Sequence, residues 1–160
     1  MIFETHGNVF EKGADIVAHQ VNCQGVMGAG IAKQIRNIYM EPKDYYRYKR
    51  LCEVNGSRNL GHVFYCVGEY RDKKRFVIAN CFGEDKIHPA DGGPATNYEA
   101  LKKCLSNVIV VARKHSFKTI AIPERIGCGL AGGDWKYVKN EIITPLFGEL
   151  NDITFIISGL

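Results

Sequence analysis

Residues 14–33 read ADIVAHQVNCQGVMGAGIAK, and this is the most informative stretch of the chain. Its first part, Ala14 to Val21, is β-branched and apolar enough to form a buried strand. Three glycines then follow within six residues, residues 25–30, where a backbone without Cβ atoms can approach a ligand closely. From Gly28 onward the chain can begin a helix, whose free N–H groups and dipole favour an anion. The pattern predicts a strand, a glycine-rich turn and a helix that together bind a phosphate-bearing small molecule.

The turn differs from the two common phosphate-binding motifs. Lys33 stands where the dinucleotide fingerprint requires its third glycine, and no stretch matches G-x-x-x-x-G-K-[ST]. A second glycine-rich loop, PERIGCGLAGGDW at residues 123–135, follows another apolar β-type run at residues 118–122. Four glycines in seven residues are costly to order, which favours a binding loop over a simple turn. Two such loops at the carboxyl edge of one sheet are expected to hold a pyrophosphate from both sides.

Together these motifs resemble the macrodomain family of ADP-ribose-binding modules. The resemblance runs over nearly all 160 residues in the family's order of elements. It rests on the segments Gly7-Asn8-Val9, His19-Gln20-Val21-Asn22-Cys23, the glycine turn at residues 25–32, and Ile126-Gly127-Cys128-Gly129-Leu130. Within the family the chain is most similar to the ADP-ribose 1″-phosphate phosphatase branch, which also has an early Gly-Asn-aliphatic triplet and a His-x-x-Asn-Cys strand end. The resemblance implies a three-layer α/β/α fold with a mixed central sheet of about six strands, in a single macrodomain at residues 1–160.

Alternating strand and helix patterns indicate the same α/β class. Strands are expected at residues 2–4, 14–21, 61–68, 75–82, 118–122 and 153–157, with the first at an edge of the sheet. Helices are expected at residues 28–38 and 42–54, and from a capping box at Thr96 through residue 115. Asp134 is expected to cap the last helix, which Pro145 must end or kink.

The resemblance also assigns the ligand contacts. Asn22 is expected at the distal ribose, and its alternative role is to cap the glycine turn. Asn8 stands where many macrodomains have an aspartate that reads the adenine amino group; its amide oxygen can still accept a hydrogen bond, without the charge. Cys128, the one thiol in a position to face the ligand, is expected to pack under its loop. The expected binding residues are Gly7, Asn8, Val9, Gln20, Val21, Asn22, Met27, Gly28, Ala29, Gly30, Ile31, Ala32, Ile126, Gly127, Cys128, Gly129, Leu130, Ala131 and Gly132.

The catalytic candidates are His19, Asp85 and Asp91. Strand alternation puts His19 on the opposite face from Asn22 unless the strand end bulges, and from the pattern alone it is a core histidine. The phosphatase resemblance instead implies a functional histidine here, which transfers protons at a terminal phosphate, paired with an aspartate of an irregular loop. That loop, residues 83–95, is expected at the same sheet edge as the glycine loops. Its ionisable residues are Glu84, Asp85, Lys86, His88 and Asp91, and the spacing does not separate the two aspartates.

The function expected first is hydrolysis of ADP-ribose derivatives, with ADP-ribose 1″-phosphate dephosphorylated to ADP-ribose. The alternative is removal of ADP-ribose from a modified protein or nucleic acid. One deacylating branch of macrodomains combines a lysine with an aspartate directly after the second loop's Gly-Leu. Ala131 stands at that place, although Lys86 could supply the lysine. A third possibility is a non-catalytic module that binds ADP-ribose.

Composition, charge and cysteine spacing argue against several other classes of protein. A hydrophobic content of 46% and a charged content of 24% are those of an ordinary soluble globular protein. No apolar run approaches the roughly 20 residues of a membrane span, and the first residues lack a signal-peptide pattern, so we expect a cytoplasmic protein without a membrane partner. The six cysteines contain no C-x-x-C pair, and neither a metal nor a cofactor is implied. A net charge of +4 is too small for a decisive nucleic-acid footprint, although an ADP-ribosylated macromolecule is compatible with it.

Overall fold

The stretch Ile16–Asn22 forms β2, which lies inside a mixed six-stranded sheet of order β1-β6-β5-β2-β4-β3. A computed structural model describes residues 1–159 of the chain, with β1 at Ile2–His6, β3 at Val63–Glu69, β4 at Arg75–Glu84, β5 at Thr119–Pro123 and β6 at Thr154–Gly159. Neighbouring strands run parallel except for β3 and β4, which are antiparallel. The expected mixed sheet of about six strands and the edge position of the first strand are confirmed.

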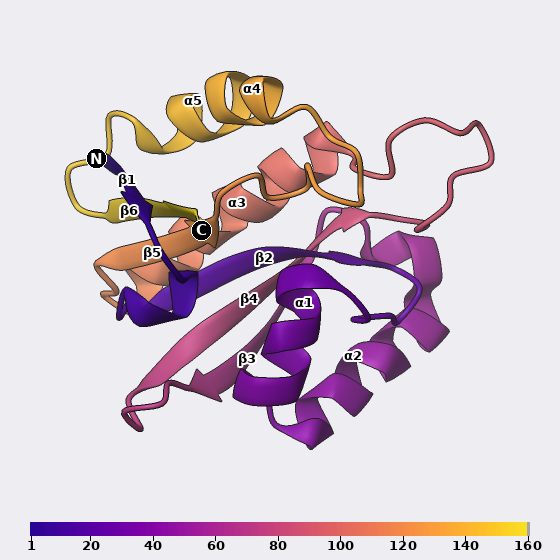
Figure 1. Ribbon diagram of the computed structural model, residues 1–160, viewed down its shortest axis with the longest axis horizontal. Helices are drawn as coiled ribbons and strands as arrows, with labels where there is room; N and C mark the ends of the chain where they lie inside the picture. Colours follow the sequence, from indigo (N-terminus) through magenta and orange to yellow (C-terminus); the bar gives the residue numbers. More distant parts are fainter. Residues whose placement is uncertain (160) are drawn as a thin grey trace.

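Helices cover both faces of this sheet (Figure 1). On one face lie α1 (Gly30–Gln34), the π-helical turn η2 (Ile35–Tyr39) and α2 (Pro42–Asn55). On the other lie α3 (Tyr98–Lys114), α4 (Trp135–Tyr137), the π-helical turn η4 (Val138–Ile143) and α5 (Thr144–Phe147). Two short 3-10 turns, η1 (Val9–Glu11) and η3 (Gly56–Asn59), complete the described elements. This is the expected three-layer α/β/α arrangement.

The helix boundaries test the capping predictions. Asp134 caps α4 as expected, because its side chain accepts hydrogen bonds from the amides of Lys136 and Tyr137. The Thr96 cap is wrong by one residue: Asn97 caps α3 and accepts from Ala100, while Thr96 bonds elsewhere. The helical path does not end at Pro145, which lies in the first turn of α5 directly after a π-helical turn. The missing N–H of proline is tolerated in a first turn.

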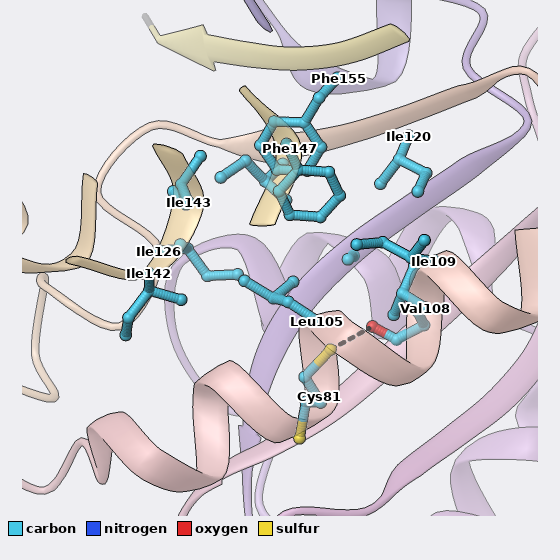
Figure 2. Packing of buried hydrophobic residues seen from close by; sticks show 14 of the residues in the cluster. Cys81, Leu105, Val108, Ile109, Ile120, Ile126, Ile142, Ile143, Phe147 and Phe155 are labelled. Atoms are coloured by element: carbon cyan, nitrogen blue, oxygen red, sulfur yellow. Dashed lines mark hydrogen bonds between the residues drawn. The ribbon is translucent and has the colours of Figure 1, made fainter. Parts of the chain in front are cut away.

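Alternate residues of β2 enter two separate cores. Ile16 and Ala18 pack on the α3 side, and Val17 and Val21 pack on the α2 side. A strand that is buried on both faces needs apolar residues at successive positions, which is why this stretch is so hydrophobic. On the α3 side, Figure 2 shows Phe147 of α5 against Phe155 of β6, with ring centroids 3.7 Å apart.

Among residues 1–159, all six cysteines are free and buried. No group of three or more His, Cys, Asp or Glu side chains in that range is placed to hold a metal ion. No helix of the described chain has the length and apolar character needed to cross a membrane.

Replacing Phe147 by alanine is expected to lower the free energy of unfolding by about 3–5 kcal/mol, because it leaves a cavity over Phe155 that the core cannot refill. Urea denaturation followed by circular dichroism measures this change. Val110→Ala is the control: Val110 is exposed on α3, and its truncation is expected to change stability by less than about 0.5 kcal/mol. Equal midpoints for the two variants would contradict the packing described here.

Candidate ligand-binding cleft

A cleft of about 650 Å³ opens where the strands β2, β4 and β5 end. The carboxyl ends of parallel strands meet at one edge of an α/β sheet, and ligands bind outside that edge. The volume lies within the usual range for small-molecule sites. The lining residues are His19, Gln20, Val21, Asn22, Val26, Gly28, Ala29, Gly30, Ile31, Ala32, Glu84, Ile87, Pro123, Glu124, Arg125, Ile126, Gly127, Gly129, Leu130 and Ala131.

Both glycine-rich loops line this cleft, as the sequence predicts for loops at one sheet edge. Six of the expected binding residues do not line it: Gly7, Asn8, Val9, Met27, Cys128 and Gly132. Met27 and Cys128 are buried in the core, so the thiol packs under its loop. Val26, Ile87 and the segment 123–125 line the cleft without having been predicted as contacts, although the segment's place between a strand and a glycine loop was a usable signal.

A second cavity, of about 640 Å³, lies between the start of α2 and the strand β3. Its charged lining includes Asp44 and Arg47, which pair with each other at 3.1 Å. Neither glycine-rich loop reaches it. The cleft at the carboxyl edge, with both loops, is therefore the candidate site.

Asn22 holds the first glycine turn together. Its Oδ1 accepts hydrogen bonds from the amides of Gln24 and Val26 and from the hydroxyl of Tyr48, at 3.0, 3.3 and 3.1 Å. Its Nδ2 donates to the carbonyl of Val26 at 2.7 Å. The alternative role considered from the sequence, a turn cap, is what the structure shows, and the ribose contact stays a prediction.

The side chain of Asn8 also hydrogen-bonds within the chain. It caps η1, since its Oδ1 accepts from the amide of Phe10 at 2.9 Å. Gly7 lies beside β6 and donates its amide to the carbonyl of Gly159 at 2.6 Å. The start of the chain therefore supports the sheet edge, and an adenine contact by Asn8 stays a prediction.

A chain of two hydrogen bonds joins the floor of the cleft to the second glycine loop. The hydroxyl of Thr96 donates to the carbonyl of Gly127 at 2.5 Å, and Nε2 of Gln20 donates to the same hydroxyl oxygen at 2.9 Å. The Gln20 side chain fits only because two neighbours are glycines: a Cβ at Gly83 or Gly127 would lie 2.3 or 2.9 Å from its Oε1. This Oε1 atom is buried and has no hydrogen-bond partner.

His19 is buried beneath the cleft and is held in one tautomer. Its Nε2 lies 2.6 Å from Oδ1 of Asn80, whose Nδ2 donates to the carbonyl of Phe64. Since the Asn80 oxygen accepts, Nε2 carries the hydrogen and Nδ1 is an unprotonated acceptor, which has no partner. Burial lowers the pKa of His19 to about 4. The imidazole is therefore neutral near pH 7.

The strand end next to His19 does bulge, between Val21 and Asn22, where Asn22 pairs with Glu84 in place of the next residue along β4. The expectation that His19 and Asn22 lie on opposite faces applied only to a strand end without a bulge. Strand alternation therefore does not separate these two residues here. His19 bonds to Asn80, and Asn22 bonds to Tyr48 of α2.

The irregular loop does not bring its aspartates to His19. Asp85 accepts from the hydroxyl of Ser57 at 2.8 and 2.9 Å, and Asp91 accepts from the amide of Gly93 at 2.9 Å. Neither aspartate lines the cleft, and Lys86 does not line it either. Figure 1 shows the loop extending away from the end of β4. Pairing of His19 with one of these aspartates in catalysis therefore stays a prediction that this arrangement does not support.

Glu84 is the ionisable residue of the loop segment that does line the cleft. It forms the last residue of β4 and is half-buried. Burial raises the pKa of its carboxyl group, and a hydrogen bond from Gln20 opposes that shift by favouring the charged form. Carboxyl groups that act as a catalytic acid or base are often partly desolvated at the floor of a cleft, as Glu84 is.

Comparison with known proteins agrees with this geometry. The model of the Macro domain family matches residues 18–142. A DNA ADP-ribosyl glycohydrolase of Mycobacterium tuberculosis is 26% identical over 162 aligned residues, which cover 98% of this chain and 42% of the relative. The chain thus spans less than half the length of this curated relative.

Solved structures show the same fold. The macrodomain of Mycobacterium tuberculosis DarG has a TM-score of 0.80 at 25% identity, with 99% of this chain and 97% of that chain covered. Thermosipho africanus DarTG, solved in complex with ADP-ribose, has a TM-score of 0.74 at 18% identity, covering 96% of this chain and 40% of that one.

Replacing Gly129 by valine is expected to weaken ADP-ribose binding at least about tenfold while the fold is kept. The backbone of Gly129 is not left-handed, and a Cβ there meets no protein atom within 4 Å, so the valine occupies open space at the cleft wall. Titration calorimetry measures the affinity. Gly133→Val is the contrasting variant: its Cβ would lie 2.5 Å from the carbonyl of Gly127, so it should lose thermal stability. Unchanged affinity in folded Gly129→Val would exclude this loop from binding.

The buried His19 makes stability depend on pH. Because its pKa is lowered to about 4 in the folded state, the unfolded chain binds more protons between pH 6.5 and 4, and stability falls as pH drops through that window. The loss attributable to His19 is at most about 3 kcal/mol. Chemical denaturation from pH 4 to 7 measures it, and His19→Gln should remove this part of the slope whereas His88→Gln, at an exposed site, should not. Identical slopes in wild type and His19→Gln would show that the histidine is not buried neutral.

Proposed function

Since the chain belongs to the macrodomain family, we propose that it is a hydrolase that removes ADP-ribose from ADP-ribosylated DNA. The observation that carries the proposal is the alignment of 98% of this chain with a DNA ADP-ribosyl glycohydrolase, combined with an open cleft at the carboxyl edge of the sheet. The similar structure of Thermosipho africanus DarTG in complex with ADP-ribose supports the choice of ligand. We expect the protein to act in the cytoplasm.

The two glycine-rich loops suit the diphosphate of ADP-ribose. Gly28 to Ala32 and Ile126 to Ala131 both line the cleft, and backbone N–H groups can approach phosphate oxygens where no Cβ intervenes. Gln20, through Thr96, holds the second loop at a fixed distance from β2. The distal ribose would then lie over the ends of β2 and β4, with the attached DNA leaving through the open mouth.

Dephosphorylation of ADP-ribose 1″-phosphate is the second candidate. It is favoured by the strand end His19-Gln20-Val21-Asn22-Cys23 and by Ala131 at the position where the deacylating branch has aspartate. It requires His19 to exchange protons at the phosphate. A buried neutral imidazole with a pKa of about 4 is a poor proton donor near pH 7, which is why we place the DNA substrate first.

Incubating the chain with a single-stranded oligonucleotide that carries ADP-ribose is expected to yield free ADP-ribose and the unmodified oligonucleotide. Mass spectrometry and anion-exchange chromatography measure both products. ADP-ribose 1″-phosphate is tested in parallel with an assay for inorganic phosphate, and little release is expected.

Three other outcomes contradict the proposal in distinct ways. Phosphate release without cleavage of the oligonucleotide would establish the phosphatase, and His19→Ala should then lower it by about 10²–10⁴-fold. Release of ADP-ribose from a modified protein but not from DNA would show that the substrate is an ADP-ribosylated protein. Binding of ADP-ribose without turnover of any of these substrates would show that the chain is a non-catalytic binding module.

A further inference from the structure

Glu84 is held in place by the sheet and not by the irregular loop that follows it. Its backbone carbonyl accepts a hydrogen bond from the amide of Cys23 at 3.1 Å, and an antiparallel bridge joins it to Thr96. In register it lies opposite Asn22, at the end of β2. The carboxyl group is therefore attached to a backbone that is fixed on both sides at the floor of the cleft.

The other ionisable residues that line the cleft are His19, Glu124 and Arg125. His19 is neutral, and its Nε2 hydrogen is committed to Asn80. The guanidinium of Arg125 donates to the carbonyl of Cys128 at 3.3 Å, and a guanidinium has no lone pair to accept a proton. Glu124 is exposed at the end of β5. Glu84 is thus the half-buried carboxylate of this cleft.

The Gln20 amide, which lines the same cleft as Glu84, has only one allowed orientation. The single proton of the Thr96 hydroxyl goes to the carbonyl of Gly127, so the hydroxyl oxygen must accept from Gln20 and Nε2 must face it. The second Nε2 hydrogen is then available to another acceptor, and the influence of Gln20 on Glu84 is to lower the pKa of its carboxyl group against the effect of burial.

We propose that Glu84 is the catalytic base of this macrodomain, acting on the water that cleaves the bond between ADP-ribose and DNA. The assignment rests on the proposed function. Glu84 takes one proton from water while the water oxygen bonds to C1″ of the distal ribose. The bond from C1″ to the DNA atom breaks, and its electron pair leaves with that atom.

The protonated Glu84 then gives its proton to the leaving DNA atom. Water is thereby divided between the two products, with OH on the ribose and H on the DNA, and no oxidant, reductant or further reactant is needed. Partial burial, which raises the pKa of Glu84, helps the protonated carboxyl exist long enough to make this second transfer.

The test compares wild type with Glu84→Gln on the ADP-ribosylated oligonucleotide. Glutamine keeps the size of the side chain but cannot accept the proton, so kcat should fall by about 10²–10⁴-fold. ADP-ribose affinity by calorimetry and the thermal midpoint should stay close to wild type. Glu99→Gln makes the same chemical change on an exposed residue of the first turn of α3 and should turn over normally.

A second variant separates chemistry from structure. In Glu84→Ala, added sodium formate should restore part of the lost rate, since a small carboxylate can occupy the vacated space, and chloride at the same ionic strength should not. Turnover of Glu84→Gln near the wild-type rate, or no formate rescue in folded Glu84→Ala, would overturn the assignment. So would loss of activity in Lys86→Ala together with full activity in Glu84→Gln. A wild-type chain that releases no ADP-ribose would instead overturn the proposed function, and the assignment with it.

Discussion

The hydrogen bonds from Gln20 to Thr96 and from Thr96 to the carbonyl of Gly127 are the interaction on which the cleft depends. They tie the end of β2, the start of α3 and the second glycine loop to one another at fixed distances. Because the threonine has one proton, the direction of both bonds is determined, and so is the orientation of the Gln20 amide. The same packing explains why residues 83 and 127 are glycines, since a Cβ at either position would collide with the Gln20 amide oxygen.

The floor of the cleft is polar and almost fully hydrogen-bonded, which makes it rigid. His19 and Asn80 pair between β2 and β4, and Asn22 and Tyr48 pair between β2 and α2. Within residues 1–159, the two buried side-chain atoms without a partner are Nδ1 of His19 and Oε1 of Gln20, on neighbouring residues that both line the cleft. Both are acceptors. A native protein keeps few unpaired buried polar atoms, and here both sit at the site where a ligand would lie.

The secondary structure was largely predictable because it follows from local pattern. The apolar run of β2 and the alternation of strands and helices required no knowledge of distant residues, and the Asp134 cap needed only its neighbours. The predicted helix cap at Thr96 was wrong because the Thr96 hydroxyl has another partner. It donates to the carbonyl of Gly127, far along the chain, and Asn97 caps the helix instead. A local motif cannot reveal such a partner.

The sequence alone is enough to predict the α/β class and two glycine-rich loops at one sheet edge, since the order of elements along the chain follows from the periodicity and from the resemblance to the family's motifs. Which ionisable residues face the cleft depends instead on how distant segments pack together. Asp85 and Glu84 are adjacent in sequence, yet Asp85 is bonded to Ser57 outside the cleft and Glu84 lines the cleft. The register between β2 and β4 shifts where these two residues follow, and this pairing joins segments far apart in the chain, so a local sequence pattern cannot predict which of their side chains enters the cleft.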